Sequence, residues 1–142
     1  MSLLRIEETG TDVDAFADAL EPLDDTEAMA RAMAATAAEL VRSTFSASRD
    51  PDGVAWRPLA RPRVGIGGAL LRTGALRDAA SSPAVDAAGF VLVVEGPKAV
   101  HQTGSRRNLP ARPFFPSSFG LPVTWETELD ASLRRALAEM LP

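Results

Sequence analysis

The 142-residue sequence has no cysteine and only one histidine, and this limits the catalytic and metal sites that it can form. Without cysteine the chain can form no disulfide, thiolate nucleophile or Cys-ligated zinc site. One histidine cannot build a His-rich metal site within one subunit. We therefore expect neither a metal nor a cofactor.

Long apolar runs are also missing, because no window approaches the roughly 18 apolar residues that cross a bilayer. The start, MSLLRIEETG, carries acidic residues where a secretory signal needs a basic stretch before an apolar one. A composition of 46% hydrophobic and 24% charged residues is typical of a soluble globular domain. We expect a single domain over residues 1–142 that is kept in a cytoplasm and has no membrane partner.

Charge is spread unevenly along the chain. Residues 1–50 hold 11 acidic and 4 basic side chains, whereas residues 56–113 hold 9 basic and 3 acidic ones. Segments of opposite charge attract, either within one subunit or between neighbours in an oligomer. An unevenly charged, solvated surface is the alternative interpretation.

Two segments have helical periodicity. The first begins at the potential caps Asp24, Asp25 and Thr26 and ends near residues 46–49. Its repeat predicts one inward face (Met29, Met33, Ala37, Leu40, Val41 and Thr44) and an outward face that includes Ala38. The second covers residues 123–140, where Trp125, Leu129, Leu133, Leu137 and Met140 follow the same repeat.

Shorter elements are expected between the helices. The stretch DPDGVAW, residues 50–56, predicts a tight turn that returns Trp56 to the interior, and the loop 57–68 follows it. Thr73 can cap a short helix from about Gly74. A turn at 88–89 then leads to a strand at 90–95, whose unbroken apolar run predicts burial on both faces or stacking in an assembly.

Together these elements predict an α+β fold. A small antiparallel sheet packs with the long helix and the C-terminal helix, and long loops rich in proline, glycine and arginine connect them. Residues 1–23 form a possible N-terminal arm, in which Leu4, Ile6 and Glu8 share one face of a strand.

The stretch HQTGSRRNLPARPFFP, residues 101–116, contains the only histidine and raises a hydrolase hypothesis. A general base at His101 would need a nucleophile and a carboxylate, and the nearest candidates are Ser105, Thr103 and Glu95. No nucleophile motif accompanies them. The glycines of RVGIGGALL lack the G-K-[ST] ending of a phosphate-binding loop. A hydrogen-bonded structural histidine is the alternative.

Six arginines suggest a second hypothesis, non-specific contact with DNA: Arg57, Arg61, Arg63, Arg106, Arg107 and Arg112. The third interpretation is architectural. Gly104 permits a turn, and Phe114 with Phe115 anchor the chain in a hydrophobic pocket. Arg112 pairs with a carboxylate on a helix or a neighbouring subunit, while His101 and Gln102 form hydrogen bonds at the end of the sheet. The loops 57–68 and 103–112 are expected to order on contact with a partner.

The order of these pieces resembles the phage virion morphogenesis family, the tail completion proteins of Mu-like phages. A helix ending in Phe45, then DPDGVAWRPL, LLRTGAL, a β-rich segment, HQTG, PARPFF and a C-terminal helix carry the resemblance over roughly residues 25–140. It implies a non-enzymatic structural virion protein of the tail or neck, assembled in the host cytoplasm. The implied partners are other copies in a ring, expected to be a hexamer, the tail tube or sheath, and head-tail connector proteins.

The resemblance and the architectural interpretation together select candidate residues. The interface candidates are Arg57, Arg61, Arg63, His101, Gln102, Arg106, Arg107, Arg112, Phe114 and Phe115. The expected core anchors are Phe45, Trp56, Phe90, Leu92, Trp125, Leu129 and Leu133.

Overall fold

The computed structural model describes residues 25–59, 70, 73–105, 109–117 and 120–141. The arm 1–23 and four of the six candidate arginines (Arg61, Arg63, Arg106 and Arg107) lie outside these residues, as do most of the glycine-rich stretch and loop 57–68. The elements are α2 (Thr26–Ala47), α3 (Ala75–Ala80), β1 (Ala84–Asp86), β2 (Gly89–Val91), the 3-10 helix η2 (Gly96–Ala99), α4 (Val100–Thr103) and α5 (Val123–Met140).

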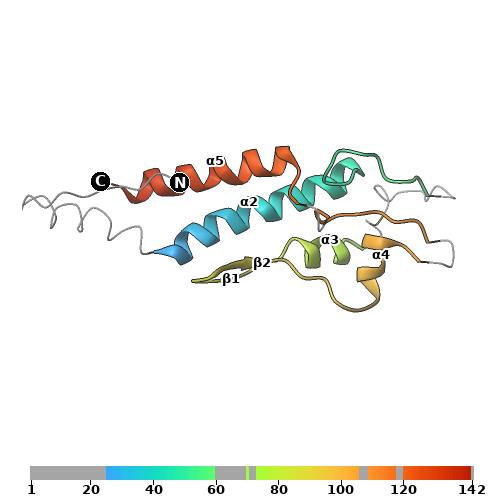
Figure 1. The fold of residues 1–142 in the computed structure, drawn as a ribbon. Coiled ribbons are helices and arrows are strands. Elements are labelled where there is room, and N and C mark those ends of the chain that lie inside the picture. The colour runs from blue at the N-terminus through green and yellow to red at the C-terminus, as the bar shows by residue number, and fades with distance from the viewer. Residues whose placement is uncertain (1–24, 60–69, 71–72, 106–108, 118–119, 142) are drawn as a thin grey trace, which may run out of the picture.

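The chain has an α+β fold organised around α2. Figure 1 shows α5 running along one side of α2, with the β1–β2 hairpin, α3 and α4 on the other side. The hairpin is a two-stranded antiparallel sheet packed against α2. The predicted fold class is therefore confirmed.

Helix α2 begins after one of its predicted caps and ends within the predicted range 46–49. The Asp25 side chain accepts a hydrogen bond from the Ala28 amide at 3.0 Å, and Ser48 takes the left-handed conformation at the C-terminal end. The buried residues are mostly small: Ala30, Ala34, Ala37, Ala38, Val41, Thr44 and Phe45. The outward placement of Ala38 was wrong, because α2 is packed on more than one side and its buried face is wider than a single stripe.

Helix α5 matches its predicted bounds and presses closely on α2. Trp125 and Leu129 are buried, whereas Leu133 is only partly buried. The Ser132 hydroxyl donates to the Ala32 carbonyl at 3.1 Å, which ties the two helices together through a backbone group. Small side chains on α2 permit this approach.

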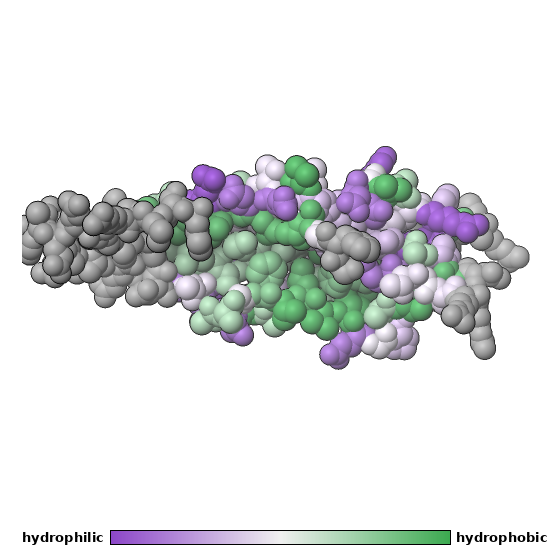
Figure 2. All heavy atoms as spheres, in the orientation of Figure 1, coloured by the Kyte–Doolittle hydropathy of each residue, from purple (hydrophilic) through white to green (hydrophobic). Residues whose placement is uncertain are grey.

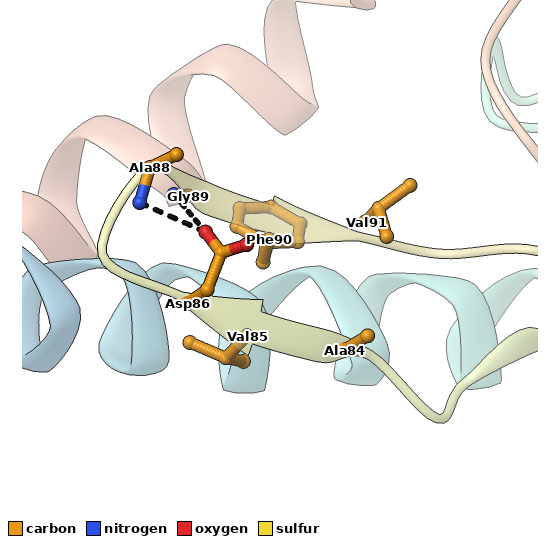
Figure 3. Close-up of a pocket in the computed structure, with 7 residues that line it drawn as sticks. All are labelled: Ala84, Val85, Asp86, Ala88, Gly89, Phe90 and Val91. Carbon is orange, nitrogen blue, oxygen red and sulfur yellow. Dashed lines mark hydrogen bonds between the residues drawn. The ribbon is translucent and has the colours of Figure 1, made fainter.

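The hairpin is shorter than predicted. The β1–β2 register pairs Ala84 with Val91 and Asp86 with Gly89, and the Asp86 carboxylate accepts from the Ala88 and Gly89 amides in the turn (Figure 3). The ladder stops at Val91 rather than at the predicted Glu95, and its partner strand begins at Ala84, directly after Pro83.

Burial on both faces was also wrong for this strand within the subunit. Val91 is 53% exposed and Val93 is 52% exposed, while Phe90, Leu92 and Val94 are partly buried. The alternation shows that one face packs on the subunit and the other faces outward. Whether the outward face stacks in an assembly stays a prediction.

The turn after α2 and the short helix α3 follow their predicted positions, whereas η2 and α4 were not predicted. In the turn after α2, the Asp50 carboxylate accepts from the Val54 amide at 2.8 Å, and the chain returns with Trp56 buried. The Thr73 hydroxyl accepts from the Ala75 amide at 3.2 Å at the start of α3. The main core cluster comprises Val41, Phe45, Trp56, Leu76, Ala80, Phe114 and Trp125, with Leu92 packed against it.

Candidate functional site

Residues 109–117 form a connecting segment that is held along its length by side chains from elsewhere in the fold. Gln102, in α4, makes the main attachment. Its amide nitrogen donates to the Phe115 carbonyl at 2.9 Å, and its amide oxygen accepts from the Phe114 and Phe115 amides at 2.9 and 3.0 Å. One side chain thus pairs with three backbone groups as a neighbouring strand would. We call residues 109–117 the pinned segment.

Arg112 lies inside the subunit, at 5% exposure. Its guanidinium donates to the Arg57 carbonyl at 2.9 Å and to the Pro58 carbonyl at 3.2 Å. The prediction that Arg112 pairs with a carboxylate was wrong within the described subunit, because its guanidinium bonds to these two carbonyls instead. Burial and the nearby Arg57 charge both lower the pKa of Arg112. Arg112 therefore joins the pinned segment to the chain after Trp56.

An aromatic cluster anchors the middle of the pinned segment. Phe114 is 1% exposed, and its ring centroid lies 5.6 Å from that of Phe45 and 4.8 Å from that of Phe115. Trp56 packs edge-on against Phe45 at 5.4 Å, and its indole nitrogen donates to the Pro113 carbonyl at 2.7 Å. The rings supply buried apolar area while the indole satisfies a backbone acceptor.

Gly104 allows the chain to pass close to the pinned segment. It has a φ of 76°, and a β-carbon there would lie 2.7 Å from the Leu109 oxygen and 2.8 Å from the Ala111 nitrogen. The Ser105 amide donates to the Leu109 carbonyl at 3.0 Å. The described part of loop 103–112 is thus already held within the subunit.

His101 lies in the short helix α4 rather than at the end of the sheet, so that part of its predicted placement was wrong. Its carbonyl accepts from the Arg112 amide at 2.8 Å. Its Nδ1 is buried and has no hydrogen-bond partner among the described residues. Burial, and then the charge of Arg112, lower the pKa of His101, so the neutral imidazole is favoured.

The structure thus divides the interface candidates. It brings His101, Gln102, Arg112, Phe114 and Phe115 together around the pinned segment, with Arg112 and Phe114 facing the interior. Arg57 is exposed, and its carbonyl receives the Arg112 bond.

The expected core anchors divide in a similar way. Phe45, Trp56, Trp125 and Leu129 are buried, and Phe90, Leu92 and Leu133 are partly buried. Sequence reasoning missed the bonds of Ser132 and of the Trp56 indole. No local pattern marks them, because their acceptors lie 100 and 57 residues away.

An apolar groove of about 450 Å³ opens between the hairpin and α5. Ala37 of α2 contributes to its lining, Phe90 and Leu92 line it from the β2 side, and Trp125 and Leu129 line it from α5. Figure 2 shows apolar side chains gathered in the middle of this face, between α5 and the hairpin. Beyond the groove lining, exposed Val91, Val93 and Val123 add apolar surface.

Among the described residues, no three histidine, aspartate or glutamate side chains are grouped as a metal site would require. In the same part of the chain, no helix combines the length and apolarity of a bilayer span.

Comparison with known proteins gives one match. The sequence model of the phage virion morphogenesis family covers residues 10–138, which include α2, the hairpin, the pinned segment and most of α5. No curated protein and no solved structure matched the chain. From the extent of the family match, the chain belongs to the phage virion morphogenesis family.

Proposed function

We propose that this protein is a structural component of a phage virion that completes or terminates the tail and joins it to the head. It acts as an oligomeric ring, expected to be a hexamer, in contact with the tail tube or sheath and the head-tail connector. Membership of a virion morphogenesis family supports the general role. The ring, its position in the neck and the partners are inferred beyond the family membership.

The observation that carries the proposal is the apolar surface around β2 and the start of α5. Leu121 is exposed at the apolar groove and Val123 is exposed just after it. Val91 and Val93 are exposed on the opposite face of the strand from Phe90 and Leu92, which line the groove. Exposed apolar surface of this kind is typical of faces that another protein covers. The pinned segment borders the groove through Phe115 and Pro116, so the groove wall is held by Gln102.

A structural role also fits the surroundings of His101 better than hydrolysis does. A general base needs an accessible nitrogen and an orienting group, whereas the Nδ1 of His101 is buried beside the cationic Arg112. Contact with DNA through Arg112 is disfavoured, because its guanidinium already donates to two backbone carbonyls. Arg57 and the arginines outside the described residues stay candidates for that contact.

The test is deletion of the gene from its phage or prophage. Lysates should accumulate full heads together with tails that are unjoined or irregular in length, and the wild-type gene supplied in trans should restore joined particles. A His101→Gln gene should restore them as well. Joined, infectious particles formed without the protein would overturn the proposal, and a measurable turnover that His101→Gln abolishes while particles still join would favour the hydrolase.

A further inference from the structure

The groove lies along the free edge of β2. The described sheet has the order β1–β2, so β2 pairs on one edge only. Phe90 and Leu92 line the groove, whereas no residue of β1 does, which places the groove on the side of β2 away from β1. An open strand edge beside an apolar channel is the arrangement that accepts an added strand.

We propose that residues 3–8 of a second copy of this chain occupy the groove and add a strand to the free edge of β2. Their sequence, LLRIEE, places Leu4 and Ile6 on the same face of a strand. That face would lie against Ala37, Trp125 and Leu129, and the backbone would pair with β2. The inference deepens the proposed ring by naming a contact between copies, and it rests on that function only for the presence of several copies.

The chain has enough length to make this contact. The described residues begin beside the hairpin turn, where the Thr26 hydroxyl donates to the Ala87 carbonyl at 2.9 Å. Residues 9–24 connect the added strand to this point. Sixteen residues span about 20–24 Å on average as a flexible chain and about 55 Å when extended, which exceeds the roughly 33 Å length of the 22-residue α2.

Charge favours a second copy over the same copy. The connector 9–24 contains five acidic residues and no basic one, and it joins the described chain at Asp25, near Asp86 and the Glu27–Arg31 ion pair of its own subunit. The like charges of the connector, Asp25 and Asp86 disfavour a path back over the same subunit. The opposite end of the domain, where α2 ends, carries Arg49 and Arg57 beside Asp50 and Asp52, and the basic residues are concentrated in the segment 56–113, with 9 basic and 3 acidic side chains. An acidic connector that meets this basic segment of a neighbour gives a head-to-tail contact, the kind that closes into a ring.

Because the natural chain has no cysteine, disulfide cross-linking tests the contact directly. The full-length single variants Ile6→Cys and Leu121→Cys are mixed and oxidised, and the linked peptides are identified by mass spectrometry. Leu121 lines the groove and is exposed, so its replacement leaves the core intact. We expect 6–121 dimers. The matched control replaces Leu121→Cys with Val54→Cys, a more exposed position outside the groove lining (63% against 46%), and should yield at least ten-fold fewer dimers.

A second pair of measurements separates the possible failures. The chain carrying both cysteines should give a ladder of linked multimers, and Leu4→Asp with Ile6→Asp should raise the concentration of half-assembly at least about ten-fold. A link confined to monomers would overturn the second copy as occupant. Absence of the 6–121 link while wild-type rings form and heads join to tails would overturn the contact and leave the proposed function standing. Failure of the proposed function would show instead as normal joining in the deletion phage.

Discussion

Gln102 offers the sharpest test of how the pinned segment is held. Gln102→Ala removes one donor and one acceptor that together satisfy the carbonyl of Phe115 and the amides of Phe114 and Phe115. A buried backbone group left without a partner costs about 1–3 kcal/mol, and the partly buried position favours the lower end. With three groups affected, we expect Gln102→Ala to lower the free energy of unfolding by about 3 kcal/mol.

The assay is urea denaturation followed by tryptophan fluorescence. Trp56 donates to the Pro113 carbonyl and so reports on the pinned segment directly. Gln102→Glu keeps an acceptor for the two amides but turns an oxygen toward the Phe115 carbonyl, so it should lose about 1–2 kcal/mol, between wild type and alanine. Thr103→Ala, at the exposed neighbouring position, should change stability by less than about 0.5 kcal/mol. If Gln102→Ala is as mild as Thr103→Ala, the segment is held by something else.

Three other substitutions test neighbouring features. Gly104→Ala should cost more than about 2 kcal/mol in urea denaturation, and Gly53→Ala only about 1, because both have positive φ but only Gly104 faces backbone atoms at 2.7–2.8 Å; equal costs would contradict this. Arg112→Met should cost about 2–4 kcal/mol by leaving two carbonyls unpaired, and an unchanged midpoint would show that the guanidinium bonds contribute nothing. Because the pKa of His101 is lower in the folded protein than in the unfolded chain, the unfolded chain takes up the proton at a higher pH. The free energy of unfolding should therefore fall as the pH drops below about 6.5, and His101→Gln should flatten that part of the stability profile. A profile identical in the two proteins would rule out the lowered pKa.

Local signals were enough to predict the helices and the turn. The cap at Asp25, the 3.6-residue repeat of Trp125 and Leu129, and the Asp50 turn that follows α2 each act over a few residues. Such interactions can be predicted from a single sequence because their partners lie only a few residues apart at a fixed spacing. The bounds of α2 and α5 followed from them.

Long-range pairing could not be predicted in the same way. The apolar run after Phe90 does not reveal that its partner strand begins just after Pro83, so its strand character was overestimated. Arg112 suggested an ion pair by its residue type, but two carbonyls some 55 residues away receive its bonds. Alanine gives no periodic apolar signal strong enough to reveal that Ala38 faces a second packing surface.

The bonds that hold the pinned segment have a consequence for how this protein can change. Gln102, Trp56 and the Ser105 amide all bond to its main chain, and they would bond equally to other side-chain types at most of its positions. An outward-facing position such as Ala111 can therefore be replaced with little effect on the path of the chain. The surface chemistry of the segment can thus change while the scaffold beneath it stays constant.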